Sequence, residues 1–166
     1  MGKNIVLIGM PGSGKSTVGV VLAKRLGYRF VDSDLVIQNK TGRLLHELIE
    51  EYGIEGFWKI ENDVNASIEA DSTVIATGGS AVYGDSAMSH LGENATVVYL
   101  SISYDELKER LGDLNARGVT LRPGQTLRDL YEERLPLYEK YADITIRCDD
   151  KALWKLVAEI DTRITK

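Results

Sequence analysis

The sequence has little cysteine, little proline and no long apolar run. Its single cysteine, Cys148, excludes an intrachain disulfide and a zinc site built from several cysteines, and fits a reducing compartment. No apolar segment approaches the roughly 18–20 residues of a membrane-spanning helix. The first residues lead directly into an apolar strand and do not resemble a signal peptide. We therefore expect a cytoplasmic protein with no membrane partner.

Positive charge is also in short supply. Lysine and arginine total 20 against 25 acidic residues, which gives a net charge of −5. This balance argues against a nucleic-acid partner, because dedicated nucleic-acid binders usually carry a strongly basic face. The 166 residues suit one domain spanning 1–166, which we expect to be a monomer.

Short apolar runs alternate with longer segments of helical periodicity. This alternation is typical of parallel strands joined by helical crossovers, and it predicts an α/β fold of three layers, α/β/α. The one irregular stretch is polar and contains arginine, so we interpret residues 112–124 as a lid. The predicted strands are 4–9, 29–32, 73–77, 95–100 and 143–147, and the predicted helices are 16–26, 35–40, 44–52, 54–70, 104–111, 127–141 and 150–164.

A phosphate-binding loop is the strongest motif. Residues 9–16 read GMPGSGKS and fit the pattern G-x-x-x-x-G-K-[ST] between a predicted strand and a predicted helix. Glycines let successive backbone N–H groups turn toward one anion, and the helix N-terminus favours negative charge there. We expect Lys15 to bind the β- and γ-phosphates and Ser16 to ligate Mg²⁺. The predicted ATP-binding residues of this loop are Gly12, Ser13, Gly14, Lys15, Ser16 and Thr17.

The class of nucleotide enzyme follows from what accompanies this loop. No Asn-Lys-x-Asp stretch is present to recognise guanine, since the run at 39–42 reads NKTG. The short chain leaves little room for motor modules. A small-molecule kinase is therefore favoured over a GTPase or an ATPase motor.

Two further loops follow predicted strands and belong at the same edge of the sheet. Asp32 and Asp34 flank Ser33 after the second strand, where carboxylates can hold Mg²⁺ or orient an attacking hydroxyl. Ser33 and Asp34 are also good helix-capping residues. Gly78 and Gly79 follow the third strand and permit close approach of a ligand to the backbone.

The order and spacing of several blocks resemble the shikimate kinase family, within the nucleoside-monophosphate-kinase-like P-loop fold. The resemblance covers nearly the whole chain. Its blocks are GMPGSGKSTVG at 9–19, FVDSD at 30–34, GIEGF at 53–57 with Glu61, TGGSAV at 77–82, and RLPLY at 134–138 with Ala142.

The resemblance implies a five-stranded parallel sheet of order 2-3-1-4-5, a substrate-binding region at 33–62, and Mg²⁺- and ATP-dependent phosphorylation of a small alcohol, with shikimate as the best single guess. By resemblance, Asp32 supports the metal and the nucleophile, and Asp34 binds substrate hydroxyls. Arg134 binds the substrate carboxylate, Arg117 meets the transferred phosphate, and Arg110 stacks on adenine. Glu61 orients a cation on the substrate side.

The sequence departs from the family pattern on the substrate side. Trp58 replaces the arginine that forms half of the carboxylate clamp, and Ser80 replaces the third glycine of a G-G-G turn. The usual lid sequence R-P-L-L is absent. Trp cannot bind a carboxylate through two parallel hydrogen bonds, and Lys59 lies about 100° further around a helix. The predicted substrate-binding residues are Asp34, Trp58, Gly78, Gly79, Ser80 and Arg134.

These departures leave three hypotheses open. The chain is a divergent shikimate kinase, a kinase of another hydroxy acid or polyol, or a nucleotide-binding module without catalysis. Among the remaining residues, we expect Trp154 to pack in the core and Arg128 to pair with neighbouring carboxylates.

Overall fold

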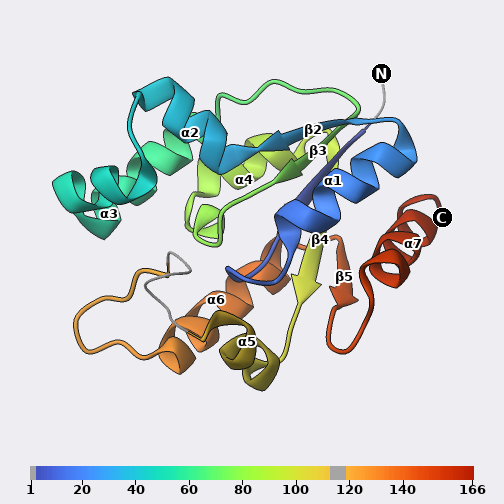
Figure 1. Ribbon diagram of the computed structural model, residues 1–166. Coiled ribbons are helices and arrows are strands. Elements are labelled where there is room, and N and C mark those ends of the chain that lie inside the picture. Colours follow the sequence, from blue (N-terminus) through green and yellow to red (C-terminus); the bar gives the residue numbers. More distant parts are fainter. Residues whose placement is uncertain (1–2, 113–118) are drawn as a thin grey trace.

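The computed structural model describes residues 3–112 and 119–166. Its five parallel strands have the order β2-β3-β1-β4-β5, which confirms the predicted sheet (Figure 1). The strands are β1 (Asn4–Ile8), β2 (Arg29–Asp32), β3 (Thr73–Ala76), β4 (Ala95–Ser101) and β5 (Ile144–Arg147). The helices are α1 (Lys15–Leu26), α2 (Ser33–Thr41), α3 (Leu45–Asn65), the 3₁₀ turn η1 (Ala81–Tyr83), α4 (Asp85–Gly92), α5 (Tyr104–Leu111), α6 (Leu127–Tyr141) and α7 (Leu153–Ile164).

Both faces of the sheet are covered, because successive side chains of a strand point to opposite faces. In β1, Ile5 and Leu7 belong to the core formed with α1 and α7, whereas Val6 and Ile8 belong to the core formed with α4, α5 and α6. All five residues of β1 are buried. This double burial explains why every residue of the central strand after Asn4 is apolar.

Helices α2 and α3 form a small unit beside the sheet, at the upper left of Figure 1. Ile37, Leu48 and Phe57 are buried in a core of their own. Gly53 has a φ of +74° and interrupts the helical geometry inside α3. The sequence predicted two helices separated by Gly53, and the structure confirms the break, because α3 consists of two helical segments that meet at a kink there.

The segment between β3 and β4 contains two elements that the sequence analysis missed, η1 and α4. Both are short, and Gly84 separates them. The last helix begins at Leu153 instead of residue 150. Trp154 was expected in the core, but 68% of its surface is exposed. The prediction failed because Leu156, Val157 and Ile160 form the buried stripe of α7, and Trp154 lies off that stripe.

No helix in the described ranges is both long enough and apolar enough to cross a membrane. Of the predicted lid, residues 112 and 119–124 are described, and Arg117 lies outside the described residues.

Candidate functional site

A cavity of about 840 Å³ opens at the carboxyl ends of the strands. The P-loop (residues 9–16) and the start of α1 form one wall, and α2 and α3 form another. The turn at 77–80, Arg134 of α6, and residues 119–120 complete the lining. The cavity therefore brings together three groups of residues that the sequence analysis singled out separately.

The P-loop has the backbone geometry that its glycines were expected to permit. Gly12 and Gly14 have φ values of +82° and +94°, a region that side chains disfavour. Gly14 is the N-cap of α1, so the first turn of the helix presents its N–H groups toward the cavity. Ser16 and Thr17 of that turn line the cavity. This arrangement suits the binding of an anion.

Lys15 is 7% exposed, and its side chain bends back over the loop. Its Nζ donates hydrogen bonds to the carbonyl oxygens of Gly9 at 2.7 Å and Met10 at 2.8 Å. Burial lowers the pKa of Lys15 to about 8, against the opposing effect of Asp34. The ammonium group thus lies in the cavity with two neutral carbonyl groups as its hydrogen-bond partners.

Asp32 and Asp34 lie side by side but have different environments. Asp32 is the N-cap of α2, and its Oδ1 accepts a 2.9 Å hydrogen bond from the backbone N–H of Asp34. The cap is therefore Asp32, and not Ser33 or Asp34. Its Oδ2 accepts a 3.4 Å hydrogen bond from the Ser16 hydroxyl. This contact brings an oxygen of the P-loop next to an oxygen of the residue that precedes α2. Burial, and then the negative charge of Asp32, raise the pKa of Asp34.

Glycines at 78 and 79 permit close packing around the cavity. A Cβ at residue 78 would lie 2.7 Å from Asp34 Oδ1 and 3.1 Å from Glu61 Oε2. A Cβ at residue 79 would lie 2.7 Å from Pro11 Cδ and 2.8 Å from Arg134 Nη1. Two carboxyl groups therefore face the backbone at Gly78, and one guanidinium faces it at Gly79.

Ser80 gives Glu61 a hydrogen-bond partner. The Ser80 hydroxyl donates to Glu61 Oε1 at 2.6 Å, and Glu61 is 3% exposed. Burial raises the pKa of Glu61 to about 7, although the Ser80 hydrogen bond opposes the shift. Glu61 was expected to orient a cation, but the ion pairs among the described residues do not include it.

Arg134 is 6% exposed and lines the cavity from α6. No ion pair among the described residues includes it. Its Nε donates a long, 3.4 Å hydrogen bond to the Tyr83 hydroxyl, and its Cζ lies 5.4 Å from the centre of the Tyr83 ring. A guanidinium that is buried without a carboxylate partner is suited to binding an anionic ligand.

Trp58 lines the cavity and packs against residues that the sequence analysis did not connect with it. Its ring stacks on Tyr83 with centroids 3.9 Å apart and an angle of 15° between the planes. The Arg122 guanidinium lies 4.8 Å from the centre of the Trp58 ring. The neighbouring Lys59 is exposed and does not line the cavity. No local signal in the sequence links Trp58 to Tyr83 or Arg122, because the three lie on different elements.

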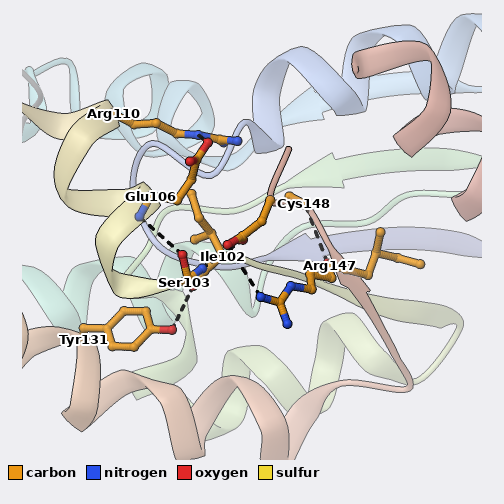
Figure 2. Close-up of polar contacts among 9 residues, drawn as sticks. Ile102, Ser103, Glu106, Arg110, Tyr131, Arg147 and Cys148 are labelled. Carbon is orange, nitrogen blue, oxygen red and sulfur yellow. Dashed lines mark hydrogen bonds and ion pairs between the residues drawn. The ribbon is translucent and has the colours of Figure 1, made fainter. Parts of the chain in front are cut away.

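The two arginines expected to contact ATP differ in what the structure describes. Arg110 of α5 pairs with Glu106 at 3.2 Å, and its Nη1 donates a 3.4 Å hydrogen bond to the carbonyl oxygen of Gly12. Figure 2 shows this guanidinium next to Glu106, where α5 approaches the P-loop. Arg110 is therefore adjacent to the loop, whereas Arg117 is outside the described residues. Arg128 Nη1 lies 3.9 Å from Glu132 Oε1, which confirms the predicted pairing of Arg128 with a neighbouring carboxylate.

Comparisons with known proteins match nearly the whole chain. A family model described as shikimate kinase matches residues 11–165. The shikimate kinase of Sulfurihydrogenibium sp. (strain YO3AOP1) is 34% identical over 165 residues, covering 99% of each chain. That of Vibrio cholerae serotype O1 is 40% identical over 159 residues, covering 94% of this chain and 91% of the relative.

Solved structures give the same match. Shikimate kinase from Acinetobacter baumannii in complex with shikimate superposes with a TM-score of 0.87 at 35% identity, covering 99% of this chain and 94% of that one. Shikimate kinase from Aquifex aeolicus gives a TM-score of 0.84 at 32% identity, with coverage of 98% and 96%.

Proposed function

Because the chain belongs to the shikimate kinase family, we propose that it transfers the γ-phosphoryl group of ATP to a hydroxyl of shikimate, forming shikimate 3-phosphate. The observation that carries the choice of acceptor is Arg134, a buried guanidinium that has no ion pair among the described residues and lines the cavity beside Lys15 and Asp34. An acceptor with one carboxylate and several hydroxyls complements these groups. The reaction belongs to aromatic amino acid biosynthesis, and we propose that the chain works as a cytoplasmic monomer.

ATP binds in this proposal along the P-loop. The backbone N–H groups at 12–17 hold the phosphates, and Lys15 exchanges its two carbonyl partners for the β- and γ-phosphate oxygens. Arg110 reaches the same side of the loop and packs on adenine. This arrangement places the γ-phosphate at the cavity, where Lys15 offsets the charge that develops during transfer.

A magnesium ion fits the oxygens of Ser16 and Asp32, which approach each other within 3.4 Å. Mg²⁺ prefers oxygen ligands, and it commonly combines one or two protein carboxylates with substrate phosphates and water. When bound, the ion neutralises phosphate charge. Asp32 would hold it, directly or through water, from the position that also caps α2.

The acceptor occupies the region built from residues 33–62 and the turn at 78–80. Asp34 accepts hydrogen bonds from its hydroxyls, and Arg134 binds its carboxylate. Gly78, Gly79 and Ser80 form the floor of this region, and Trp58 lines it at the side. Closure of the lid at 112–124 brings Arg117 to the transferred phosphate and excludes water, which limits hydrolysis of ATP.

The decisive experiment measures ADP release by a coupled assay in the presence of ATP, Mg²⁺ and a panel of acceptors. Shikimate is expected to give the highest kcat/KM, ahead of other hydroxy acids and polyols. A higher value for another acceptor would overturn the assignment of shikimate but keep the kinase. ATP binding without acceptor-stimulated ADP release would identify a nucleotide-binding module instead.

A further inference from the structure

The environment of Trp58 assigns a role to the residue that replaces the family's arginine. One face of its ring is covered by Tyr83, stacked at 3.9 Å. Arg122 lies over the same ring, 4.8 Å from its centre. The indole is thus in contact with both η1 and the segment that precedes α6.

Tyr83 connects this stack to Arg134. Its ring lies 5.4 Å from the Arg134 Cζ, and its hydroxyl accepts from Arg134 Nε at 3.4 Å. The same hydroxyl donates to Glu133 Oε2, and Glu133 Oε1 accepts from Arg122 Nη1 at 3.1 Å. Trp58, Tyr83, Glu133 and Arg122 therefore form a closed ring of contacts, and Arg134 lies against one member of it.

We infer that Trp58 is a positioning residue that orients the Arg134 guanidinium for the acceptor's carboxylate, and that it acts through Tyr83 with Arg122 and Glu133 completing the support. The inference rests on the proposed function. A guanidinium binds a carboxylate well only when its planar fork faces the two oxygens, so fixing its orientation raises affinity without adding a contact. Here a single guanidinium held in place performs what the family divides between two arginines.

The position of each group supports an indirect role. Trp58 and Arg134 line the cavity, whereas Tyr83, Glu133 and Arg122 lie outside its lining. Tyr83 is wedged between Trp58 and Arg134, so removal of the indole frees one face of the phenol. The contact between the Tyr83 hydroxyl and Arg134 Nε is long, at 3.4 Å, and is weak without the stacked indole.

The test compares wild type with Trp58→Leu, Trp58→Phe and Tyr83→Phe, using KM for shikimate, KM for ATP, and the inhibition constant of shikimate carboxamide, which keeps the ring but carries no carboxylate. Trp58→Leu and Tyr83→Phe should raise KM for shikimate roughly three- to tenfold, the weight of one aromatic pair or hydrogen bond. KM for ATP and the inhibition constant of the carboxamide should stay unchanged. Trp58→Phe keeps a stacking ring and should recover most of the affinity.

Matched controls are Trp154→Leu and Tyr52→Phe, which change exposed aromatic residues that are not members of the ring of contacts. An equal loss for shikimate and its carboxamide would overturn the inference, because Trp58 would then touch the acceptor itself. Unchanged KM for shikimate in both Trp58→Leu and Tyr83→Phe would overturn it as well. If the wild type does not phosphorylate shikimate, the proposed function fails first, and the inference falls with it.

Discussion

The Ser80 hydroxyl donates a 2.6 Å hydrogen bond to Glu61 Oε1, next to the point where Asp34 and Glu61 both face Gly78. The serine occupies the third position of a turn where the family has glycine, and its φ of −93° is one that any residue adopts. The substitution therefore costs no backbone strain and supplies a donor to a buried carboxyl group. Without the Ser80 hydroxyl, Glu61 Oε1 would stay buried but would lose this hydrogen bond, which is unfavourable for a desolvated oxygen.

The raised pKa of Glu61 predicts a pH-dependent stability. Its folded pKa of about 7 lies above its ordinary value of 4.5 because burial disfavours the charge. The folded state therefore binds the proton more tightly, so this stabilisation is present below pH 4.5 and is lost as pH rises through 7. Glu61→Gln stays neutral, and relative to it the wild type should lose roughly 2–3 kcal/mol between pH 5 and pH 8.

Denaturant unfolding of both proteins across that range provides the measurement. Ser80→Ala is the informative companion, because the Ser80 hydrogen bond opposes the shift and its removal should raise the Glu61 pKa further. Relative to the amide variant, the loss of stability would then continue to higher pH values and reach a larger total. Parallel curves for wild type and Glu61→Gln would show that Glu61 is ionised throughout.

Gly79→Ala should weaken binding of the acceptor. The new Cβ would stand 2.7 Å from Pro11 Cδ and 2.8 Å from Arg134 Nη1, and a proline ring in the P-loop cannot swing away. Displacing Arg134 from the acceptor's carboxylate removes one charge-assisted contact, worth about 1.5–3 kcal/mol, or roughly ten- to a hundredfold in KM. Gly92→Ala is the matched control, since its Cβ would meet its nearest neighbour at 3.9 Å. Equal kinetics for the two variants would contradict the tight packing at residue 79.

The lowered pKa of Lys15 predicts that nucleotide affinity depends on pH. Burial lowers its pKa to about 8 in the protein without nucleotide, and phosphate binding requires the charged form. The dissociation constant of ADP should therefore rise about tenfold between pH 7 and pH 9. Isothermal titration calorimetry measures the constant directly. Lys15→Ala should bind far more weakly and lack this rise, and a rise that persists in the variant would assign it to another group.

The sheet and the P-loop were predictable because their signals are local. An apolar run followed by GMPGSGKS specifies a strand, an anion-binding turn and a helix within a few residues, and the strand order came with the resemblance. The segment containing η1 and α4 gave no such signal, because its helices are too short for a clear periodicity and Gly84 divides them.

The substrate side was harder to predict because its side chains act across the fold. The sequence marked Trp58 and Ser80 as departures from the family but could not supply their partners. Tyr83 reaches Trp58 only through the packing of η1 against α3, and Arg122 arrives from a segment without regular structure. The sequence also misplaced Trp154, which it predicted in the core but which is exposed. An aromatic residue at helical spacing does not specify which face of α7 is buried.

Asp32 combines two roles that substitution separates. It caps α2 through the N–H of Asp34, and its other oxygen approaches Ser16, where the proposed Mg²⁺ binds. Asparagine caps helices as well as aspartate does but carries no charge, whereas alanine does neither. Asp32→Asn should therefore keep the stability of the wild type while kcat falls by about 10²–10⁴ and more Mg²⁺ is needed for half-maximal rate. Asp32→Ala should show the same loss of activity and lose about 1 kcal/mol of stability as well.

Magnesium titrations of the reaction rate and thermal unfolding of the three proteins distinguish these effects. Wild-type turnover and an unchanged Mg²⁺ requirement in Asp32→Asn would contradict the metal-binding role and leave Asp32 with the role of helix cap alone. Ser33→Ala provides the control on the same turn, because Ser33 is buried and does not line the cavity. Its kcat and its Mg²⁺ requirement should match those of the wild type, so a loss of activity confined to position 32 identifies the carboxylate, and not the turn, as the group that holds the metal.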